Sequence, residues 1–260
     1  MAELRFLGTS DSKGVPRWWC ECPVCTDARA GGPNRRTRPS ALLSAGAERL
    51  LLDFGPDLHA QLTREGITQL THAVVTHAHN DHLLGLGDLL DAAPLGGPDP
   101  SVYAPAAVLP QVRERFGYAF RKREAVRPLP EQGLAVCGFV LRAFEVPHGF
   151  NGTSFGLRFD APGYRWAYVT DAIDISGAVQ QAWMSDLDLL VLGTTFYHEQ
   201  HPRAGRSVYD VTEALELPAA RTAKRVILTH LGHDVDVRCG RLPDPRFAYA
   251  REGLRLELPT

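Results

Sequence analysis

The sequence predicts a layered α/β fold in a single domain that spans residues 1–260. Short runs rich in Val, Leu and Ile alternate with amphipathic stretches, which is the pattern of buried strands separated by helices. Hydrophobic residues occupy 44% of the 260 positions, enough for a substantial core. No internal repeat or long polar linker divides the chain, which favours one domain over two. Periodicity alone does not distinguish a single sheet from two.

The predicted strands are short apolar runs bounded by turn-forming residues, at 4–7, 41–45, 50–54, 73–76, 139–146, 154–159, 166–170, 187–192 and 226–229. The predicted helices are amphipathic stretches, at 57–65, 83–92, 107–116, 176–184 and 208–215. Three further stretches are long and rich in Gly, Pro, Cys and His, which is typical of functional loops: residues 10–39, 193–207 and 230–245.

The net charge of the chain is −2, so its overall balance indicates neither a nucleic-acid surface nor a membrane surface. No apolar run reaches the roughly 18 residues that a membrane-spanning helix needs. The N-terminus has the pattern of a first strand and not that of a signal peptide, so we expect a cytoplasmic protein. In that compartment the five cysteines are expected to be reduced, buried or metal-bound rather than paired.

The segment from Thr76 to His82 reads Thr-His-Ala-His-Asn-Asp-His, directly after an apolar strand and before a predicted helix. Its three imidazoles and one carboxylate are the ligand types that borderline divalent metals prefer. A loop this tight points His77 and His79 one way and Asp81 and His82 another, which favours two adjacent metals over one. The alternative is a surface loop that is merely rich in histidine.

Three further ligand types stand in the same position relative to a predicted strand. His148, Asp171 and His230 each follow an apolar run that ends in a buried-strand pattern. A single His after a strand is usually an ordinary loop residue, but the repeated placement predicts that the three converge on the metal site.

These seven residues resemble the signature of the metallo-β-lactamase-fold superfamily, H-x-H-x-D-H followed by a His, an Asp and a His at strand ends. The resemblance implies an α+β (αββα) sandwich of two mixed β-sheets flanked by helices, with the site along one edge. By carry-over, His77, His79 and His148 would bind the first metal. Asp81, His82 and His230 would bind the second metal, and Asp171 would bridge both. Members hydrolyse several classes of bond, so the fold does not fix the reaction.

Three thiols within six residues provide most of a tetrahedral zinc site, and they are Cys20, Cys22 and Cys25. A structural zinc there would clamp a loop of about residues 10–39. His233, three residues after His230, is the preferred fourth ligand, and Cys239 is the second choice. The alternative is three reduced thiols without a metal. Cys137 lies in an apolar run and is expected in the core.

The zinc-type pattern also resembles one branch of the superfamily, the cyclic phosphodiesterase of bacterial phosphonate breakdown, which acts on phosphoribosyl cyclic phosphate. The resemblance rests on Phe-Leu-Gly-Thr-Ser at 6–10, Trp-Cys-Glu-Cys-Pro-Val-Cys at 19–25 and Ile-Leu-Thr-His-Leu-Gly-His at 227–233. In that branch the three cysteines and the second His of H-x-x-H hold a structural zinc. Pyrroloquinoline-quinone biosynthesis protein B shares the N-terminal pattern.

The sequence departs from this branch at one catalytic position. The branch carries a catalytic His before its late helix, where this chain has Val208. His198 and His201, a few residues earlier, are the predicted substitutes as proton donor, and the alternative is that both are solvated loop residues. The basic run at 34–38 could bind a phosphate or could simply be solvated.

We therefore expect a metal-dependent hydrolase, a phosphodiesterase that acts on a small or cyclic phosphodiester substrate. Two divalent metals, Mn or Zn, would lower the pKa of a shared water from about 15.7 towards about 7. Asp81 would position this nucleophile or accept its proton. The alternatives are an RNA-end nuclease, a lactonase or thioesterase, and a non-hydrolytic cofactor-biosynthesis protein. Nucleic acid is not favoured because the chain is acidic; no membrane partner is expected, and a homodimer is a possible assembly.

Overall fold

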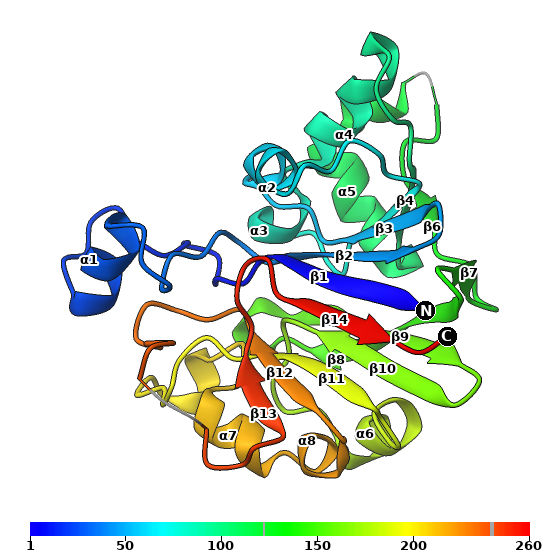
Figure 1. The fold of residues 1–260 in the computed structure, drawn as a ribbon. Coiled ribbons are helices and arrows are strands. Elements are labelled where there is room, and N and C mark those ends of the chain that lie inside the picture. The colour runs from blue at the N-terminus through cyan, green and yellow to red at the C-terminus, as the bar shows by residue number, and fades with distance from the viewer. Residues whose placement is uncertain (122, 240–241) are drawn as a thin grey trace.

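The structure is a computed structural model that describes residues 1–121, 123–239 and 242–260, and two seven-stranded sheets form its centre (Figure 1). The strands of the first sheet, in spatial order, are β14 (Arg255–Leu258), β1 (Ala2–Gly8), β2 (Ser40–Ala45), β3 (Glu48–Leu52), β4 (His72–Val74), β5 (Ser101–Ala104) and β6 (Arg127–Pro128). Those of the second sheet are β13 (Phe247–Tyr249), β12 (Val226–Thr229), β11 (Leu189–Gly193), β10 (Tyr164–Val169), β9 (Thr153–Ala161), β8 (Phe139–Pro147) and β7 (Leu134–Val136). Both sheets mix parallel and antiparallel pairs.

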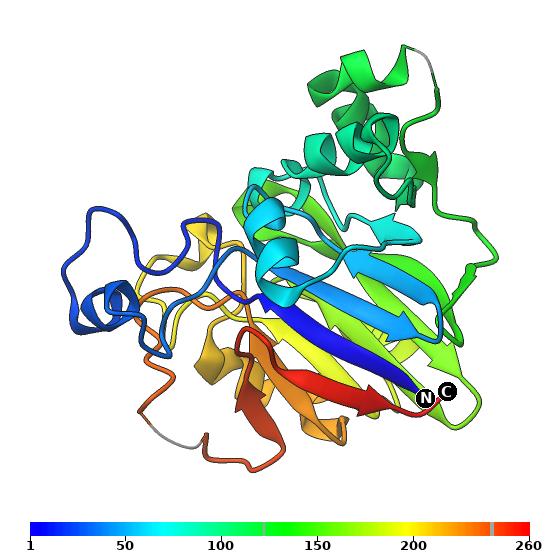
Figure 2. The ribbon, with the colours of Figure 1, turned by 45° about the horizontal axis from the view of Figure 1, so that its top comes forward.

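Helices cover the outer faces of the sandwich, as Figures 1 and 2 show. Those on the first sheet are α2 (Leu58–Glu65), α3 (Asn80–Leu83), α4 (Leu86–Ala92) and α5 (Leu109–Arg115); those on the second are α6 (Gly177–Trp183), α7 (Val211–Glu216) and α8 (Pro218–Thr222). Helix α1 (Pro23–Arg29) projects from the sandwich with its flanking loop. Short 3₁₀ turns occupy Ala93–Leu95, Ala106–Val108, Gly117–Phe120, Gly149–Asn151 and Arg203–Gly205. Among the described residues, no helix is long and apolar enough to cross a membrane.

The core has three layers because successive side chains of a strand point to opposite faces of its sheet. In β3, Leu50 and Leu52 pack between the two sheets, whereas Leu51 packs against the helices of the first sheet. The side chains of β11 alternate in the same way: some pack between the two sheets, and the others pack against the helices of the second sheet. Central strands are therefore apolar on both faces, which explains why their runs did not reveal how many sheets there are.

All nine predicted strands and all five predicted helices have counterparts in the structure, and the αββα sandwich is confirmed. The predicted helix at 83–92 corresponds to α4, which Gly85 caps, and shares only Leu83 with α3, which was not predicted. The sequence did not predict strands β5, β6, β7, β13 and β14 or helices α1 and α8. Residues 240 and 241, in the predicted loop 230–245, lie outside the described residues.

Candidate metal centre

The seven residues predicted to bind metals lie together at one edge of the sandwich, after the carboxyl ends of four strands. The segment 77–82 follows β4, His148 follows β8, Asp171 follows β10 and His230 follows β12. Strands β8, β10 and β12 run in one direction, because β9 is antiparallel to both β8 and β10, while β10, β11 and β12 are parallel. Their ends therefore bring three distant side chains to one place, and we call the seven residues the strand-end cluster.

One group within this cluster contains His77, His79 and His148, whose ligand atoms all lie within 4.8 Å of one another. His77 Nε2 is 2.9 Å from His79 Nδ1, and His148 Nε2 is 3.3 Å from the same atom. His79 stands at the N-cap of α3, where the chain turns from extended to helical, and its Nδ1 faces the other two rings.

A second group contains Asp81, His82 and His230, again with all ligand atoms within 4.8 Å. Asp81 Oδ2 is 3.2 Å from His82 Nε2 and 3.4 Å from His230 Nε2. The first turn of α3 carries both Asp81 and His82, so a single short helix provides two of these three groups.

Asp171 lies between the two groups. Its carboxylate oxygens are 3.0 Å from His82 Nε2, 3.4 Å from His230 Nε2 and 3.6 Å from His148 Nε2. Asp171 Oδ1 lies near a histidine of each group, His148 and His230, while Oδ2 lies near His82, and a carboxylate between two groups is in the placement expected of a bridging ligand.

The cluster fits divalent cations in both its distances and its donors. Four ligands about 2.1 Å from a tetrahedral metal are about 3.4 Å from one another, close to the separations observed here. His82 Nε2 and Asp171 Oδ2 are buried 3.0 Å from each other, and among the described residues neither makes a contact with hydrogen-bond geometry. Burying polar atoms without partners is costly, and a cation between them would remove that cost.

Hydrogen bonds fix the outward-facing nitrogens of four histidines, which directs each Nε2 into the cluster. The bonds are His77 Nδ1 to Thr76 Oγ1 (3.0 Å), His82 Nδ1 to Asp53 Oδ2 (2.8 Å), His148 Nδ1 to the Ser207 carbonyl (2.7 Å) and His230 Nδ1 to Thr195 Oγ1 (3.1 Å). Such partners set the tautomer and ring orientation of metal-binding histidines.

Asp53 is a functional residue that the sequence reasoning missed. It is fully buried, and besides His82 it accepts hydrogen bonds from the backbone N–H and the hydroxyl of Thr76. Asp53 shows the sequence pattern that predicted three of the ligands, because it is a polar residue directly after an apolar strand. The predicted strand at 50–54 hid this pattern, because β3 ends at Leu52.

The backbone around the cluster is unusually close-packed. A Cβ atom on Gly55 would lie 2.1 Å from the carbonyl oxygen of Asp81, so only glycine allows these two segments to approach. Asp53 and His230 adopt left-handed φ angles of 54° and 60°. Such conformations are uncommon outside glycine and are often found at functional sites.

The pKa values in the cluster reflect burial opposed by neighbouring charge. Burial acts to raise the pKa of Asp171, but His230 and His82 outweigh it and hold this pKa well below its usual range. Burial acts to lower the pKa of His82, but Asp53 and the nearby carboxylates raise it well above the ordinary value. Burial keeps the pKa of His77 low. The carboxylates are therefore ionised, and a metal at His82 would displace its proton.

The cluster opens into a cleft with a volume of about 270 Å³. All three loops that were predicted to be functional contribute to its walls, through Asp11, Ser12, Lys13 and Arg17, through Thr195, Phe196, Glu199 and Ser207, and through His230. Asn151 and Val208, outside those loops, also line it. Glu199 Oε2 is held by Arg206 Nε at 3.0 Å. Val208, at the position of the catalytic His of the related branch, faces this cleft.

His198 and His201, the predicted proton donors, are not among the residues that line the cleft. His198 is 61% exposed, and its Nδ1 lies 3.2 Å from Thr212 Oγ1 on α7. His201 is exposed and lies against Gly205, with its Nδ1 3.2 Å from the Pro202 carbonyl. Contacts outside the cleft thus hold both rings, and Glu199 is the acidic residue of this loop that reaches its wall.

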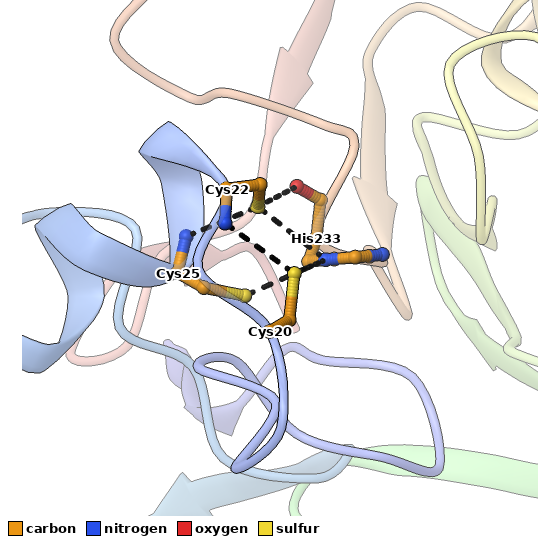
Figure 3. A group of neighbouring side chains, drawn as sticks. All are labelled: Cys20, Cys22, Cys25 and His233. Atoms are coloured by element: carbon orange, nitrogen blue, oxygen red, sulfur yellow. Dashed lines mark hydrogen bonds between the residues drawn. The ribbon is translucent and has the colours of Figure 1, made fainter.

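The three thiols of the N-terminal loop converge on His233, and we call these four residues the cysteine cluster (Figure 3). His233 Nδ1 lies 3.3 Å from Cys20 Sγ, 3.5 Å from Cys22 Sγ and 3.4 Å from Cys25 Sγ. A tetrahedral zinc would place nitrogen and sulfur ligands about 3.6 Å apart. Backbone N–H groups of Cys22, Cys25 and Arg17 donate to the sulfurs, as they do to thiolates.

The structure thus brings the preferred fourth residue, His233, to the thiols. Cys239, the second choice, is exposed and outside the cluster. Burial raises the pKa of Cys25 to about 11, so a thiolate there calls for a neighbouring cation. Cys137 is fully buried between the sheets, and its predicted place in the core is confirmed.

Part of the basic run at 34–38 has a structural role in this loop. Arg36 is buried, and its Nη2 donates to the carbonyls of Gly232 and Val235 at 2.8 and 3.0 Å. Arg38 pairs with Asp57 at 3.0 Å. Both arginines tie the loop to the body of the protein and are not among the residues that line the cleft.

Two mixed sheets packed face to face, with a cluster of His and Asp at the strand ends, define a protein of the metallo-β-lactamase fold. The family described as the β-lactamase superfamily domain matches residues 48–231, which contain the whole strand-end cluster. The chain belongs to this superfamily, so the predicted resemblance is confirmed.

Two named relatives are similar to this chain in sequence. An octanoyltransferase of Porphyromonas gingivalis is 29% identical over 240 residues, or 88% of this chain, and the chain spans 45% of that relative's length. A coenzyme PQQ synthesis protein B of Methylorubrum populi is 28% identical over 231 residues, which cover 77% of this chain and 75% of the relative.

Solved structures share the fold over nearly the whole chain. A diphosphatase from the PhnP family matches with a TM-score of 0.82 and 29% identity, covering 99% of this chain and 98% of that one. Zinc-bound PqqB from Methylobacterium extorquens matches with a TM-score of 0.77 at 21% identity, covering 98% and 100%. The short form of human tRNase Z matches with a TM-score of 0.71 at 19% identity, covering 99% and 100%. The last two likenesses concern the fold alone.

Proposed function

We propose that this chain is a metal-dependent hydrolase that cleaves a small phosphodiester. The observation that carries this proposal is the strand-end cluster itself, seven converging ligand types that open into a cleft. On this proposal, two divalent cations (Mn or Zn) are bound. One is held by His77, His79 and His148 and the other by Asp81, His82 and His230, with Asp171 bridging both. The cysteine cluster holds one structural zinc.

Two observations support a small phosphodiester over other substrates. The cleft, at about 270 Å³, is near the lower end of the range for small-molecule sites, which disfavours a long RNA end. Lys13 and Arg17 give it cationic side chains that suit an anionic substrate. The diphosphatase from the PhnP family, at 29% identity, adds a precedent for phosphoryl chemistry on this fold.

When bound, divalent cations at such a site acidify a water and withdraw charge from the scissile group. The residues of this chain orient the reacting groups and exchange protons with them. Asp81, beside His82 and His230, positions the attacking water or accepts its proton. The hydrogen bonds between the histidine Nδ1 atoms and Thr76, Asp53, Ser207 and Thr195 hold the rings fixed, so the site is organised before substrate binds.

The test is hydrolysis of bis(p-nitrophenyl) phosphate by the full chain, reconstituted separately with Mn and Zn. Because p-nitrophenolate leaves without protonation, this assay does not depend on a proton donor at the position of Val208. We expect turnover that requires metal and falls at least about 10³-fold in His79→Ala, with its thermal unfolding little changed. His59→Ala, which alters an exposed histidine outside the cleft, is the matched control.

The possible outcomes separate the proposal from its alternatives. Turnover in His79→Ala within tenfold of the wild type would contradict the assigned site. No turnover with both metal groups filled would exclude phosphodiester hydrolysis. Lactones and thioesters would then be assayed next, and the non-hydrolytic role of the PQQ synthesis relatives would gain support.

A further inference from the structure

We propose that two tryptophans of the N-terminal loop anchor a homodimer. Each copy inserts Trp18 and Trp19 into an apolar groove between α2 and α4 of the other copy. Trp18 is 85% exposed and Trp19 is 54% exposed. Exposed aromatic side chains are enriched in binding surfaces, where their burial supplies much of the affinity. Two adjacent indoles in water therefore mark a surface that binds a partner.

A tight turn presents the two indoles in a fixed arrangement. The Cys20 N–H donates to the Arg17 carbonyl at 3.1 Å, so the two tryptophans occupy the central positions of a four-residue turn. Arg29 Nη2 donates to the carbonyls of both residues that flank the pair. The two rings pack edge to face, with their centroids 5.2 Å apart. A partner therefore meets an anchor that is already ordered, which lowers the entropic cost of binding.

The groove that receives the anchor lies at the surface of the helices that cover the first sheet. It has a volume of about 520 Å³, within the range of sites that enclose a ligand the size of two indoles. Its floor and walls are mainly aliphatic and include Leu62, Ile67, Leu70, Leu89, Pro98 and Pro100. The same chain thus carries both an exposed aromatic anchor and an apolar groove of matching size.

Complementary charges favour a second copy of this chain as the occupant. Residues 10–39 contain six Lys or Arg and three Asp or Glu, whereas residues 86–99 contain three Asp and no Lys or Arg. Asp88, on the groove wall, and Asp91 are exposed and make no ion pair within the described part of the chain. Arg29, beside the tryptophans, is exposed and contacts carbonyls rather than carboxylates. The loop of one copy and the groove of another would therefore attract each other.

The area of the two contacts reaches what a stable dimer needs. Burial of the two indoles removes about 300 Å² from water on each turn, and the groove that covers them loses a similar area. Two such contacts related by a twofold axis bury roughly 1,200 Å², the lower end of the range for specific interfaces. The loop projects from the sandwich together with α1, so it can reach a neighbouring molecule (Figures 1 and 2).

Sedimentation velocity of the zinc-loaded full chain, between about 0.1 and 100 μM, tests the proposal. We expect a monomer–dimer equilibrium whose Kd rises at least about 30-fold in Trp18→Ala, which removes the anchor, and in Thr63→Trp, which fills the groove. Phe150→Ala, which removes another exposed aromatic ring, should keep the wild-type Kd. A chain that stays monomeric throughout, or a Kd in Trp18→Ala within about threefold of the wild type, overturns the proposal.

Asp88→Lys reverses a charge on the groove wall without filling the groove, and it should raise the Kd about tenfold. It replaces Thr63→Trp if that variant does not fold. An unchanged Kd in Asp88→Lys, together with a Kd that does not respond to added salt, overturns the role of charge in the choice of partner.

Photo-cross-linking identifies the occupant directly. The variant Trp18→p-benzoylphenylalanine is mixed with wild-type chain labelled with ¹⁵N and irradiated, so that a link between two copies joins one unlabelled and one labelled peptide. We expect such links to fall on residues 59–70 or 86–100. Links to another surface of the second copy, or links within one chain only, overturn the proposal.

Discussion

The two metal-ligand clusters of this protein are built in opposite ways. The strand-end cluster draws its members from the ends of β4, β8, β10 and β12, and all of them except His79 are buried. The cysteine cluster takes three of its four members from one loop. That loop has a small apolar core of its own, made of Val15, Val24 and Ala28.

Because of this difference, we expect the strand-end cluster to depend on the fold, whereas the N-terminal loop should depend on the metal bound by its cysteine cluster. Two sheets and their cores position the strand-end cluster, so its residues should stay in place when the metal is removed. The loop around the cysteine cluster buries little apolar surface, so it should lose its order when the thiols lose their metal. On the proposed function, the first cluster serves chemistry and the second serves structure.

Of the substitutions that test this difference, Cys22→Ser should have the largest effect, a loss of order in the N-terminal loop. Cys22 is both a member of the cysteine cluster and the N-cap of α1. Because structural zinc supplies about 10 kcal/mol of apparent folding free energy in zinc peptides, trypsin should cleave the loop at least about a hundredfold faster. The loop offers the necessary sites: Lys13, Arg17, Arg29, Arg35 and Arg36.

Cys239→Ser is the matched control for this variant, because Cys239 is exposed and lies outside the cluster. It should leave both the zinc content and the cleavage pattern unchanged. An equal effect of the two substitutions would contradict the assignment of His233 as the fourth ligand.

Asp53→Asn should weaken metal binding at the strand-end cluster about 10–100-fold, since it removes the charge that orients and polarises His82. Competition with a chromophoric chelator measures this affinity. Activity should return at higher metal concentration, because the ligands themselves are intact. Asp88→Asn, at an exposed position on α4, is the control. Wild-type affinity in Asp53→Asn would show that Asp53 serves only packing.

Gly55→Ala should have the smallest effect of the three, a loss of about 1–3 kcal/mol in the free energy of unfolding. The added Cβ would meet the Asp81 carbonyl, so the segment that carries the ligands must shift. Urea denaturation measures the loss, and metal analysis should show reduced occupancy at the strand-end cluster but not at the cysteine cluster. Gly177→Ala has open space around its Cβ and should stay within about 0.5 kcal/mol of the wild type.

The sequence predicted the strand-end residues because ligand types recur at one kind of position, directly after apolar strands. Asp53 obeys the same rule and was missed only because its strand was extended by two residues. His198 and His201 were chosen by nearness in sequence to Val208. A loop of this length can turn any of its residues inward, and contacts with Thr212 and Pro202 direct these two away from the cleft.

The unpredicted elements share a physical cause. Strands β13 and β14 pair at sheet edges through short segments in which exposed and buried residues alternate, so they lack the continuous apolar run of a central strand. Helix α1 has seven residues and is capped by Cys22, a residue with no usual capping signal. Likewise, no sequence pattern revealed that Arg17 faces the cleft, because its position depends on the fold of the whole loop.

The most direct test of the difference between the two clusters is hydrogen exchange of the full chain, metal-free and reloaded with zinc. We predict that metal removal exposes the backbone amides of residues 10–39 to rapid exchange, while strands β4, β8, β10 and β12 keep their protection. Retained protection in 10–39, with loss at the strand ends, would contradict the account. It would show that the metal, and not the fold, orders the strand-end site.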